Sequence, residues 1–201
     1  MSTPLRHTSA TPAPSEKPSG EPPAAQAGAP DAPAGGEWLD VVNERDEVTG
    51  RAPRAEVHRR GLRHRAVHVL VFNRQGEVFL QKRSRFKDRQ PGLWDSSASG
   101  HVDSGETYDA CARREVGEEL GVELAAAPKR RFKLDASPAT DQEFVWVYEA
   151  RAEGPFRLPP EEIERGGWFA PAEVSRWLAE RPEDFASAFQ VLWPMFCARR
   201  W

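Results

Sequence analysis

The arrangement of apolar and polar positions along the chain predicts a series of short strands. Residues 66–72 (AVHVLVF) are almost continuously apolar and β-branched, which is typical of a strand buried on both faces. Residues 73–76 have the composition of a turn and lead into a second run at 78–81, so the two runs predict a hairpin. Further strands are expected at 38–42, from Trp94 onward, at 132–134 and at 144–150, with a turn at 46–50.

Helical periodicity marks three other segments. Residues 107–120 repeat apolar positions every three to four residues, and Pro171 is placed to open a helix over 172–180. Residues 184–199 predict a terminal amphipathic helix. Because strands and helices are interleaved and joined by hairpins, the pattern favours an α+β fold with a mixed sheet. A Rossmann fold is disfavoured because the sequence has no Gly-x-Gly-x-x-Gly.

Composition divides the chain into two parts. Residues 1–36 contain eight of the eighteen prolines and none of the aromatic residues. Such a segment cannot bury enough apolar surface to offset the entropy of ordering it, so we expect a disordered tail at 1–36. Residues 37–201 carry every aromatic side chain, and their length suits a single domain.

Charge and hydropathy argue against several classes of function. The formal charge of −3 is too close to zero for a protein that coats a nucleic-acid polymer. No apolar run approaches the roughly 18 residues that a membrane span requires, and the N-terminus lacks the apolar core of a secretory signal. We therefore expect a cytoplasmic protein whose partners include neither a nucleic-acid polymer nor a membrane.

The candidate chemistry lies on an acidic helix face within residues 107–120. On a helical wheel, Glu118 and Glu119 fall at about −60° and +40° from Glu115, so the three carboxylates share one face. Like charges this close repel each other and weaken an isolated helix, which suggests a cation between them. An oxygen-rich site suits a hard ion such as Mg²⁺ or Mn²⁺. A solvated acidic face is the alternative interpretation.

The full spacing of glycine and charged residues around this helix resembles the signature of the Nudix family. From Gly100, five residues lead to Glu106, and seven more lead to Arg114 and Glu115. An aliphatic residue, the Glu118-Glu119 pair and Gly121 followed by another aliphatic residue complete the match. So many fixed identities at fixed spacing make this a strong signal, unlike a lone glycine-rich loop.

The resemblance implies a Nudix-type α/β/α sandwich with a mixed sheet between helices. It also implies that divalent cations hold a diphosphate while water cleaves the phosphoanhydride. Matched by position, Glu115, Glu118 and Glu119 would be the metal ligands, with Glu118 also the candidate general base. Arg114 is the other candidate catalytic residue. The residues expected to support the loop and helix are Gly100, Glu106 and Gly121.

The flanking sequence resembles the branch of this family that contains isopentenyl-diphosphate isomerase and its hydrolase relatives. The matching segments include LQKRS at 80–84 and PGLWDSSASGH at 91–101. In that branch, histidines and acidic residues at such positions bind a metal. This implies a second metal site, or structural support of the loop, at His64, His101, Asp141 and Glu143. Arg83 and Lys87 would contact substrate phosphate, unless they are solvated charges at a sheet edge.

Ser99 favours hydrolysis over isomerisation. It stands where the isomerase has a cysteine that takes part in proton transfer, and a hydroxyl has too high a pKa for the same role. The sequence therefore predicts a Mg²⁺- or Mn²⁺-dependent hydrolase acting on a small molecule, a nucleoside diphosphate linked to another group. The alternatives are an isopentenyl-diphosphate isomerase and a non-catalytic nucleotide-binding module on the same fold. Assembly as a homodimer is left open.

Overall fold

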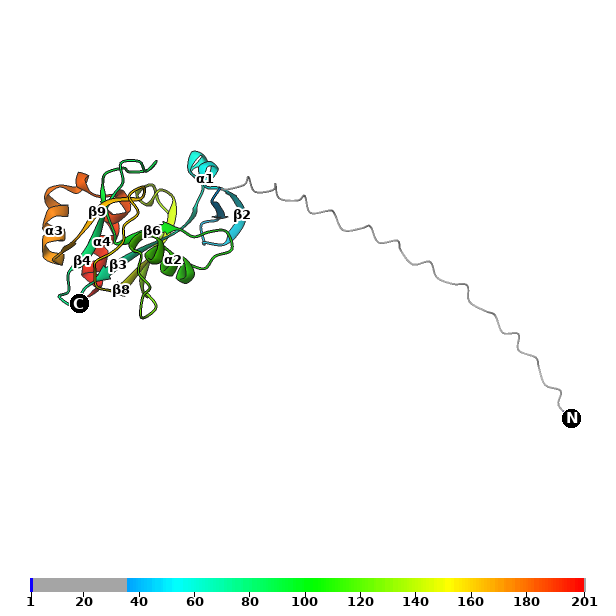
Figure 1. Cartoon of the computed structure of the whole chain (residues 1–201). Coiled ribbons are helices and arrows are strands. Elements are labelled where there is room, and N and C mark those ends of the chain that lie inside the picture. Colours follow the sequence, from blue (N-terminus) through cyan, green and yellow to red (C-terminus); the bar gives the residue numbers. More distant parts are fainter. Residues whose placement is uncertain (2–35, 201) are drawn as a thin grey trace. The chain divides into compact units, whose positions relative to one another are not determined.

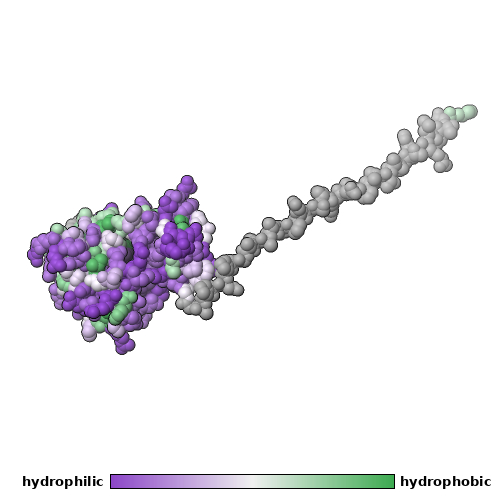
Figure 2. All heavy atoms as spheres, turned by 90° about the horizontal axis from the view of Figure 1, so that it is seen from above, coloured by the Kyte–Doolittle hydropathy of each residue, from purple (hydrophilic) through white to green (hydrophobic). Residues whose placement is uncertain are grey.

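The computed structural model describes residue 1 and residues 36–200. The predicted tail lies outside the described residues, apart from residues 1 and 36. Within the described part of the chain, no helix is long and apolar enough to cross a membrane. The face of the domain seen in Figure 2 is mostly hydrophilic, with small scattered apolar areas.

A seven-stranded mixed sheet forms the centre of the domain. Its strands are β3 (His64–Phe72), β4 (Val78–Arg83), β5 (Trp94–Asp95), β6 (Ala98–His101), β7 (Lys129–Leu134), β8 (Glu143–Arg151) and β9 (Ile163–Phe169). The order is β5-β4-β3-β8-β7, while β6 pairs with β3 and β9 pairs with β4. Strands β3 and β8 run parallel, and the other pairs are antiparallel. The prediction of an α+β fold with a mixed sheet is confirmed.

Helices cover both faces of this sheet (Figure 1). On one face α2 (Tyr108–Leu120) packs Val116 and Leu120 against the apolar side of β3. On the other face α3 (Pro171–Glu180) and α4 (Ser187–Arg200) bury a cluster that includes Phe189 and Trp193. The structure is thus an α/β/α sandwich, as the sequence resemblance implies.

Local sequence explains where α2 begins and ends. The Thr107 side chain accepts a hydrogen bond from the Ala110 backbone N–H at 3.2 Å, which caps the first turn. Gly121 has φ = 65° and ends the helix in the left-handed region that glycine adopts without strain. The helix predicted at 107–120 is therefore confirmed, with Thr107 as its cap.

Three elements precede the central sheet, and only the first was expected. Strand β1 (Trp38–Val42) pairs with β2 (Val48–Pro53), and α1 (Arg54–Arg60) follows directly. The predicted turn at 46–50 is wrong from Val48 onward, because β2 starts there. The sequence of β2 contains a glycine and ends in proline, and α1 buries only Val57, so neither shows a clear apolar period.

Two expectations about the sheet need correction. The hairpin joins β3 and β4 at the single pair Phe72–Val78, after which each strand pairs with other partners. Strand β9 was not predicted, because Gly166 and Gly167 weaken the strand pattern. Gly166 is needed there, since a Cβ at this position would lie 2.1 Å from Cζ of Phe79.

Candidate active site

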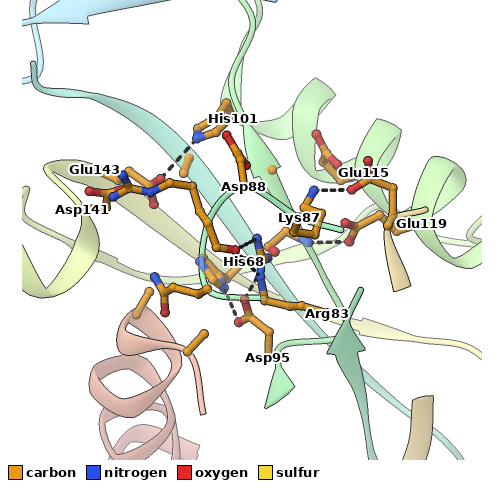
Figure 3. A pocket seen from close by; sticks show the side chains of 18 of the residues that line it. His68, Arg83, Lys87, Asp88, Asp95, His101, Glu115, Glu119, Asp141 and Glu143 are labelled. Atoms are coloured by element: carbon orange, nitrogen blue, oxygen red, sulfur yellow. Dashed lines mark hydrogen bonds and ion pairs between the residues drawn. The ribbon is translucent and has the colours of Figure 1, made fainter. Parts of the chain in front are cut away.

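A polar cavity of about 770 Å³ opens where α2, β6 and the loop after β4 meet. The sequence-predicted residues that line it are Arg83, Lys87, Gly100, His101, Arg114, Glu115, Glu118, Glu119, Asp141 and Glu143. In Figure 3, Glu115 and Glu119 lie on one side of the cavity, and Asp141 and Glu143 lie on the opposite side. Glu106 and Gly121 do not line the cavity, which suits the supporting roles expected of them.

The three carboxylates of α2 differ in their exposure. Glu115 and Glu119 are only 8% and 7% exposed, whereas the Glu118 side chain is 60% exposed at the rim. Glu119 Oε2 accepts hydrogen bonds from Gln81 Nε2 at 2.8 Å and from the Ser99 backbone N–H at 2.9 Å. These bonds aim the Glu119 carboxylate at the end of β6.

Burial and mutual repulsion disfavour the ionised forms of the two inner glutamates. Burial, and then the nearby charge of Glu119, raise the pKa of Glu115 to about 8. Burial likewise raises the pKa of Glu119 to about 7, although Ser99 and Gln81 donate hydrogen bonds to it. Two buried carboxylates that resist ionisation at neutral pH are a suitable place for a divalent cation, whose charge would remove this cost.

Arg114 connects α2 to the loop between β6 and α2, residues 102–107, which we call the glycine loop. Its Nε and Nη2 donate to the Glu106 carboxylate at 3.0 and 2.9 Å, and Nη2 also donates to the His101 carbonyl at 3.0 Å. Its Nη1 donates to Glu115 Oε1 at 2.7 Å and to Glu118 Oε2 at 3.0 Å. Arg114 therefore fixes two of the three carboxylates, and Glu106 holds Arg114 from behind.

Three histidines form a cluster at the cavity, where His58 and His101 line the wall and His64 is fully buried. One nitrogen from each of His58, His64 and His101 lies within 4.8 Å of the others, an arrangement that could hold a metal ion. The sequence pattern pointed to His64 and His101 but missed His58, which α1 brings to the cluster. Asp141 contacts the same group, with Oδ2 3.3 Å from His58 Nδ1, and also pairs with Arg89.

The hydrogen bonds of His64 leave a lone pair aimed into the cluster. Its Nδ1 lies 2.9 Å from the Leu62 carbonyl, which can only accept, so Nδ1 carries the ring proton of the neutral side chain. The fully buried Nε2 has no hydrogen-bond partner among the described residues and faces Glu143 Oε1 at 3.5 Å. A lone pair directed at a carboxylate is unfavourable unless a cation lies between them.

The pKa values of His58, His101 and Glu143 are shifted in different directions. Burial, followed by repulsion from His101 and His64, lowers the pKa of His58 to about 4, so the ring stays neutral and one of its nitrogens can bind a cation. Burial opposes the charge on His101, but hydrogen bonds with Glu143 and Glu37 outweigh it and raise its pKa to about 9. Burial would raise the pKa of Glu143, yet the contact of its Oε1 with His101 Nε2 at 3.3 Å holds the pKa below its ordinary value.

The loop before α2 and α2 itself lie within a segment of the chain that matches known proteins. The model of the NUDIX domain matches residues 62–189, more than half of the chain. The chain belongs to the Nudix hydrolase family. It is 35% identical to an uncharacterised Nudix hydrolase of Yersinia pestis, over 77% of this chain and 85% of that protein.

A solved structure supports the same assignment. The crystal structure of DR0079 from Deinococcus radiodurans superposes with a TM-score of 0.71 at 34% identity, covering 79% of this chain and 98% of that one. The uncharacterised Nudix hydrolase YfcD of Escherichia coli is 33% identical over 78% of this chain and 86% of its own length. Members of the family act as pyrophosphohydrolases, generally use divalent metals and take small-molecule substrates. This chain is accordingly a Nudix hydrolase.

The basic side chains at the end of β4 and in the loop that follows it are only partly directed into this cavity. Arg83, Lys87 and Arg89 line it, whereas Lys82 pairs with Glu164 at 3.7 Å. Lys87 is held by an ion pair with Glu162. The predicted cations Arg83 and Lys87 thus both reach the cavity, each with a carboxylate partner already in place.

Proposed function

We propose that this cavity binds a diphosphate together with Mg²⁺ or Mn²⁺ and hydrolyses its phosphoanhydride linkage. The observation that carries the proposal is the pair of buried carboxylates, Glu115 and Glu119, packed against the glycine loop opposite the basic side chains. Glu118 completes the oxygen ligands from the exposed side of the same helix turn. Oxygen donors of this kind suit Mg²⁺ or Mn²⁺ better than softer metals.

The proposed roles follow from the positions of the side chains. A bound divalent cation would neutralise charge that develops on the phosphate groups. Glu118 is the proposed general base, because its side chain is exposed at the cavity rim and can accept a proton from an attacking water. Arg114 holds Glu115 and Glu118 in place, and Arg83 and Lys87 contact the phosphates. Gly100, Glu106 and Gly121 keep the loop and helix in register.

The cavity lining supports a polar organic group on the substrate. Its apolar side chains are those of Ala66, Phe86, Ala186 and Ala188, and the phenyl ring of Phe86 is 81% exposed. A short alkyl diphosphate would find little apolar surface to bury there, whereas a nucleoside has hydrogen-bonding groups and a ring. We therefore favour a nucleoside diphosphate linked to another group over isopentenyl diphosphate. Ser99 also argues against the isomerase.

Product analysis across a substrate panel tests this function. Purified protein with Mg²⁺ is expected to release phosphate-containing products from at least one nucleoside diphosphate derivative, and EDTA is expected to abolish the release. The same protein is expected to incorporate no deuterium into isopentenyl diphosphate in D₂O. Deuterium incorporation without product release would establish the isomerase instead. Binding of nucleotides without turnover of any of them would establish a non-catalytic module.

We further propose that His58, His64, His101 and Glu143 hold a second divalent cation. The unpartnered Nε2 of His64 and one ring nitrogen of His58 are buried polar atoms that a metal would satisfy. The Leu62 carbonyl that fixes the His64 ring is the kind of outer contact that orients a histidine ligand. Asp141 lies behind His58 and orients it.

Removing one histidine is expected to remove this second cation selectively. His64→Ala should weaken Mn²⁺ binding at this site by at least about tenfold, while Mn²⁺ binding at the α2 glutamates persists. Calorimetric titration with Mn²⁺ measures both events, and Glu118→Gln is the complementary variant that should weaken the other one. Identical Mn²⁺ titrations of the wild-type protein and His64→Ala would show that the histidines are structural.

A further inference from the structure

The cavity floor holds a group of buried polar side chains that the proposed hydrolysis does not use. His68, Asp95 and Ser96 are 5%, 3% and 0% exposed, and His68 and Asp95 line the cavity beside Arg83. Figure 3 shows His68, Arg83 and Asp95 together on one side of the cavity. Burying polar groups this deeply costs free energy unless their hydrogen bonds are satisfied, so we expect each of these side chains to have hydrogen-bond partners.

Asp95 organises the group. Its Oδ1 accepts a hydrogen bond from the Ser96 backbone N–H at 2.8 Å and lies 3.5 Å from His68 Nδ1. Its Oδ2 accepts a hydrogen bond from Arg83 Nη1 at 3.4 Å. The carbonyl of Arg89 accepts from Arg83 Nη2 at 3.1 Å and holds the guanidinium from the other side. The charge of Asp95 is therefore balanced by the cation that it positions.

The Ser96 hydroxyl is the nearest hydrogen-bond partner of His68 Nδ1. The Ser96 hydroxyl lies 2.7 Å from His68 Nδ1 but 3.4 Å from Asp95 Oδ1 and from the Ala98 carbonyl. When the hydroxyl donates to Nδ1, the neutral ring carries its proton on Nε2. In the protonated ring Nε2 also carries a proton. His68 Nε2, which has no hydrogen bond with another described residue, is thus a donor in these two forms. It is an acceptor when Nδ1 carries the proton of the neutral ring and donates to Ser96, so the subsite proposed below requires one of the two donor forms.

This nitrogen belongs to a side chain that lines the same cavity as the proposed cation ligands Glu115 and Glu119. His68 on β3 pairs directly with Ser99 on β6, and paired residues in a sheet direct their side chains to the same face. The Ser99 backbone N–H in turn donates to Glu119 at 2.9 Å. An anion between His68 and the α2 glutamates would meet the donors of His68 and Arg83 on one side. On its other side it would meet the cation that the glutamates are proposed to hold.

We propose that His68 and Arg83, positioned by Asp95 and Ser96, form an anion subsite that binds one phosphate group of the diphosphate substrate. This inference rests on the proposed function, because it assigns the second end of the same diphosphate. Arg83 supplies guanidinium N–H donors that Asp95 and the Arg89 carbonyl hold in place, and His68 supplies a further N–H donor. The position of His68 in the buried strand 66–72 would by itself indicate a core histidine with satisfied hydrogen bonds.

Calorimetric binding of imidodiphosphate, a non-hydrolysable diphosphate, tests the subsite in the presence of Mg²⁺. His68→Ala is expected to weaken binding by about tenfold, the usual cost of losing a hydrogen bond to a charged group. His68→Gln retains an N–H donor and should recover part of the affinity. Mn²⁺ binding at the α2 glutamates should be unchanged in both variants, because neither touches those carboxylates.

Two neighbouring serines provide a matched control for a purely structural effect. Ser96→Ala frees the His68 ring and is expected to weaken imidodiphosphate binding by about threefold. The buried Ser97 hydroxyl bonds only backbone groups, Val71 N–H and the Phe79 carbonyl, so Ser97→Ala should lower Tm without changing affinity. Wild-type affinity in His68→Ala, or equal losses of affinity in both serine variants, would overturn the subsite. Failure of the wild-type protein to bind imidodiphosphate with Mg²⁺ would instead contradict the proposed diphosphate site itself.

Discussion

Glu119→Gln is expected to lower the rate of diphosphate hydrolysis by at least about 10²-fold while the domain still folds. The substitution removes one charge from the proposed cation site but leaves an amide oxygen that can accept from Gln81 and Ser99. Glu118→Gln is expected to cause a loss of similar size, because it removes both a ligand and the proposed base. Steady-state hydrolysis of a substrate identified in the panel measures both effects.

Thermal unfolding distinguishes loss of the site from loss of the fold. Burial raises the pKa of Glu119 from its ordinary value of 4.5 to about 7. The free energy of unfolding of the metal-free protein therefore falls as pH rises through this interval and levels off above about pH 7. Metal-free Glu119→Gln should therefore be at least as stable as the wild type at pH 8, while losing most of the stabilisation by Mg²⁺. The exposed Glu123 offers a matched control, and Glu123→Gln should change neither property. Wild-type turnover in both Glu118→Gln and Glu119→Gln would refute the site.

Gly100→Ala is expected to be nearly as damaging, although it removes no functional group. A Cβ at position 100 would lie 2.0 Å from Oε1 and 2.1 Å from Cδ of Glu115, so the carboxylate must move. A displacement of about 1 Å in a catalytic arrangement can reduce turnover by about 10²-fold. The expected result is a loss of that order in turnover, together with weaker Mn²⁺ binding.

Gly117 provides the matched control within α2. A Cβ there would meet no atom within 4 Å, so Gly117→Ala should leave turnover intact. Replacing glycine inside a helix should also stabilise the domain by about 0.5–1 kcal/mol. Equal turnover in Gly100→Ala and the wild type would mean that the position of Glu115 does not matter for the reaction.

The sequence predicts α2 and its carboxylates well because their determinants are local. The Thr107 cap, the terminal Gly121 and the period of apolar residues lie within one continuous segment. The 3.6-residue period also places Glu115, Glu118 and Glu119 on the same side. The period does not reveal that Glu115 and Glu119 are buried while Glu118 is exposed. That difference arises because residues of β4 and β6, which precede α2 in the chain, cover Glu115 and Glu119.

The histidine cluster depends on pairing between distant segments and was only partly predictable. The parallel register of β3 and β8 places His64 directly opposite Glu143, and β6 adds His101 beside Ala66. His58 lies on a seven-residue helix that buries only Val57, so no periodic pattern marked that segment. The signal for His58 in the sequence was its position, a few residues before the buried strand β3. The role proposed for His68 likewise depends on Ser96 and Asp95, 28 and 27 residues further along the chain.

Anomalous X-ray diffraction from crystals grown with Mn²⁺ locates bound cations directly. It shows whether the carboxylates of α2 hold the divalent cation proposed for hydrolysis. The expected result is an anomalous peak bounded by Glu115, Glu118 and Glu119, and a second peak among His58, His64, His101 and Glu143. A map whose peaks all lie away from the α2 carboxylates would contradict the account, even if the histidine cluster contained a metal.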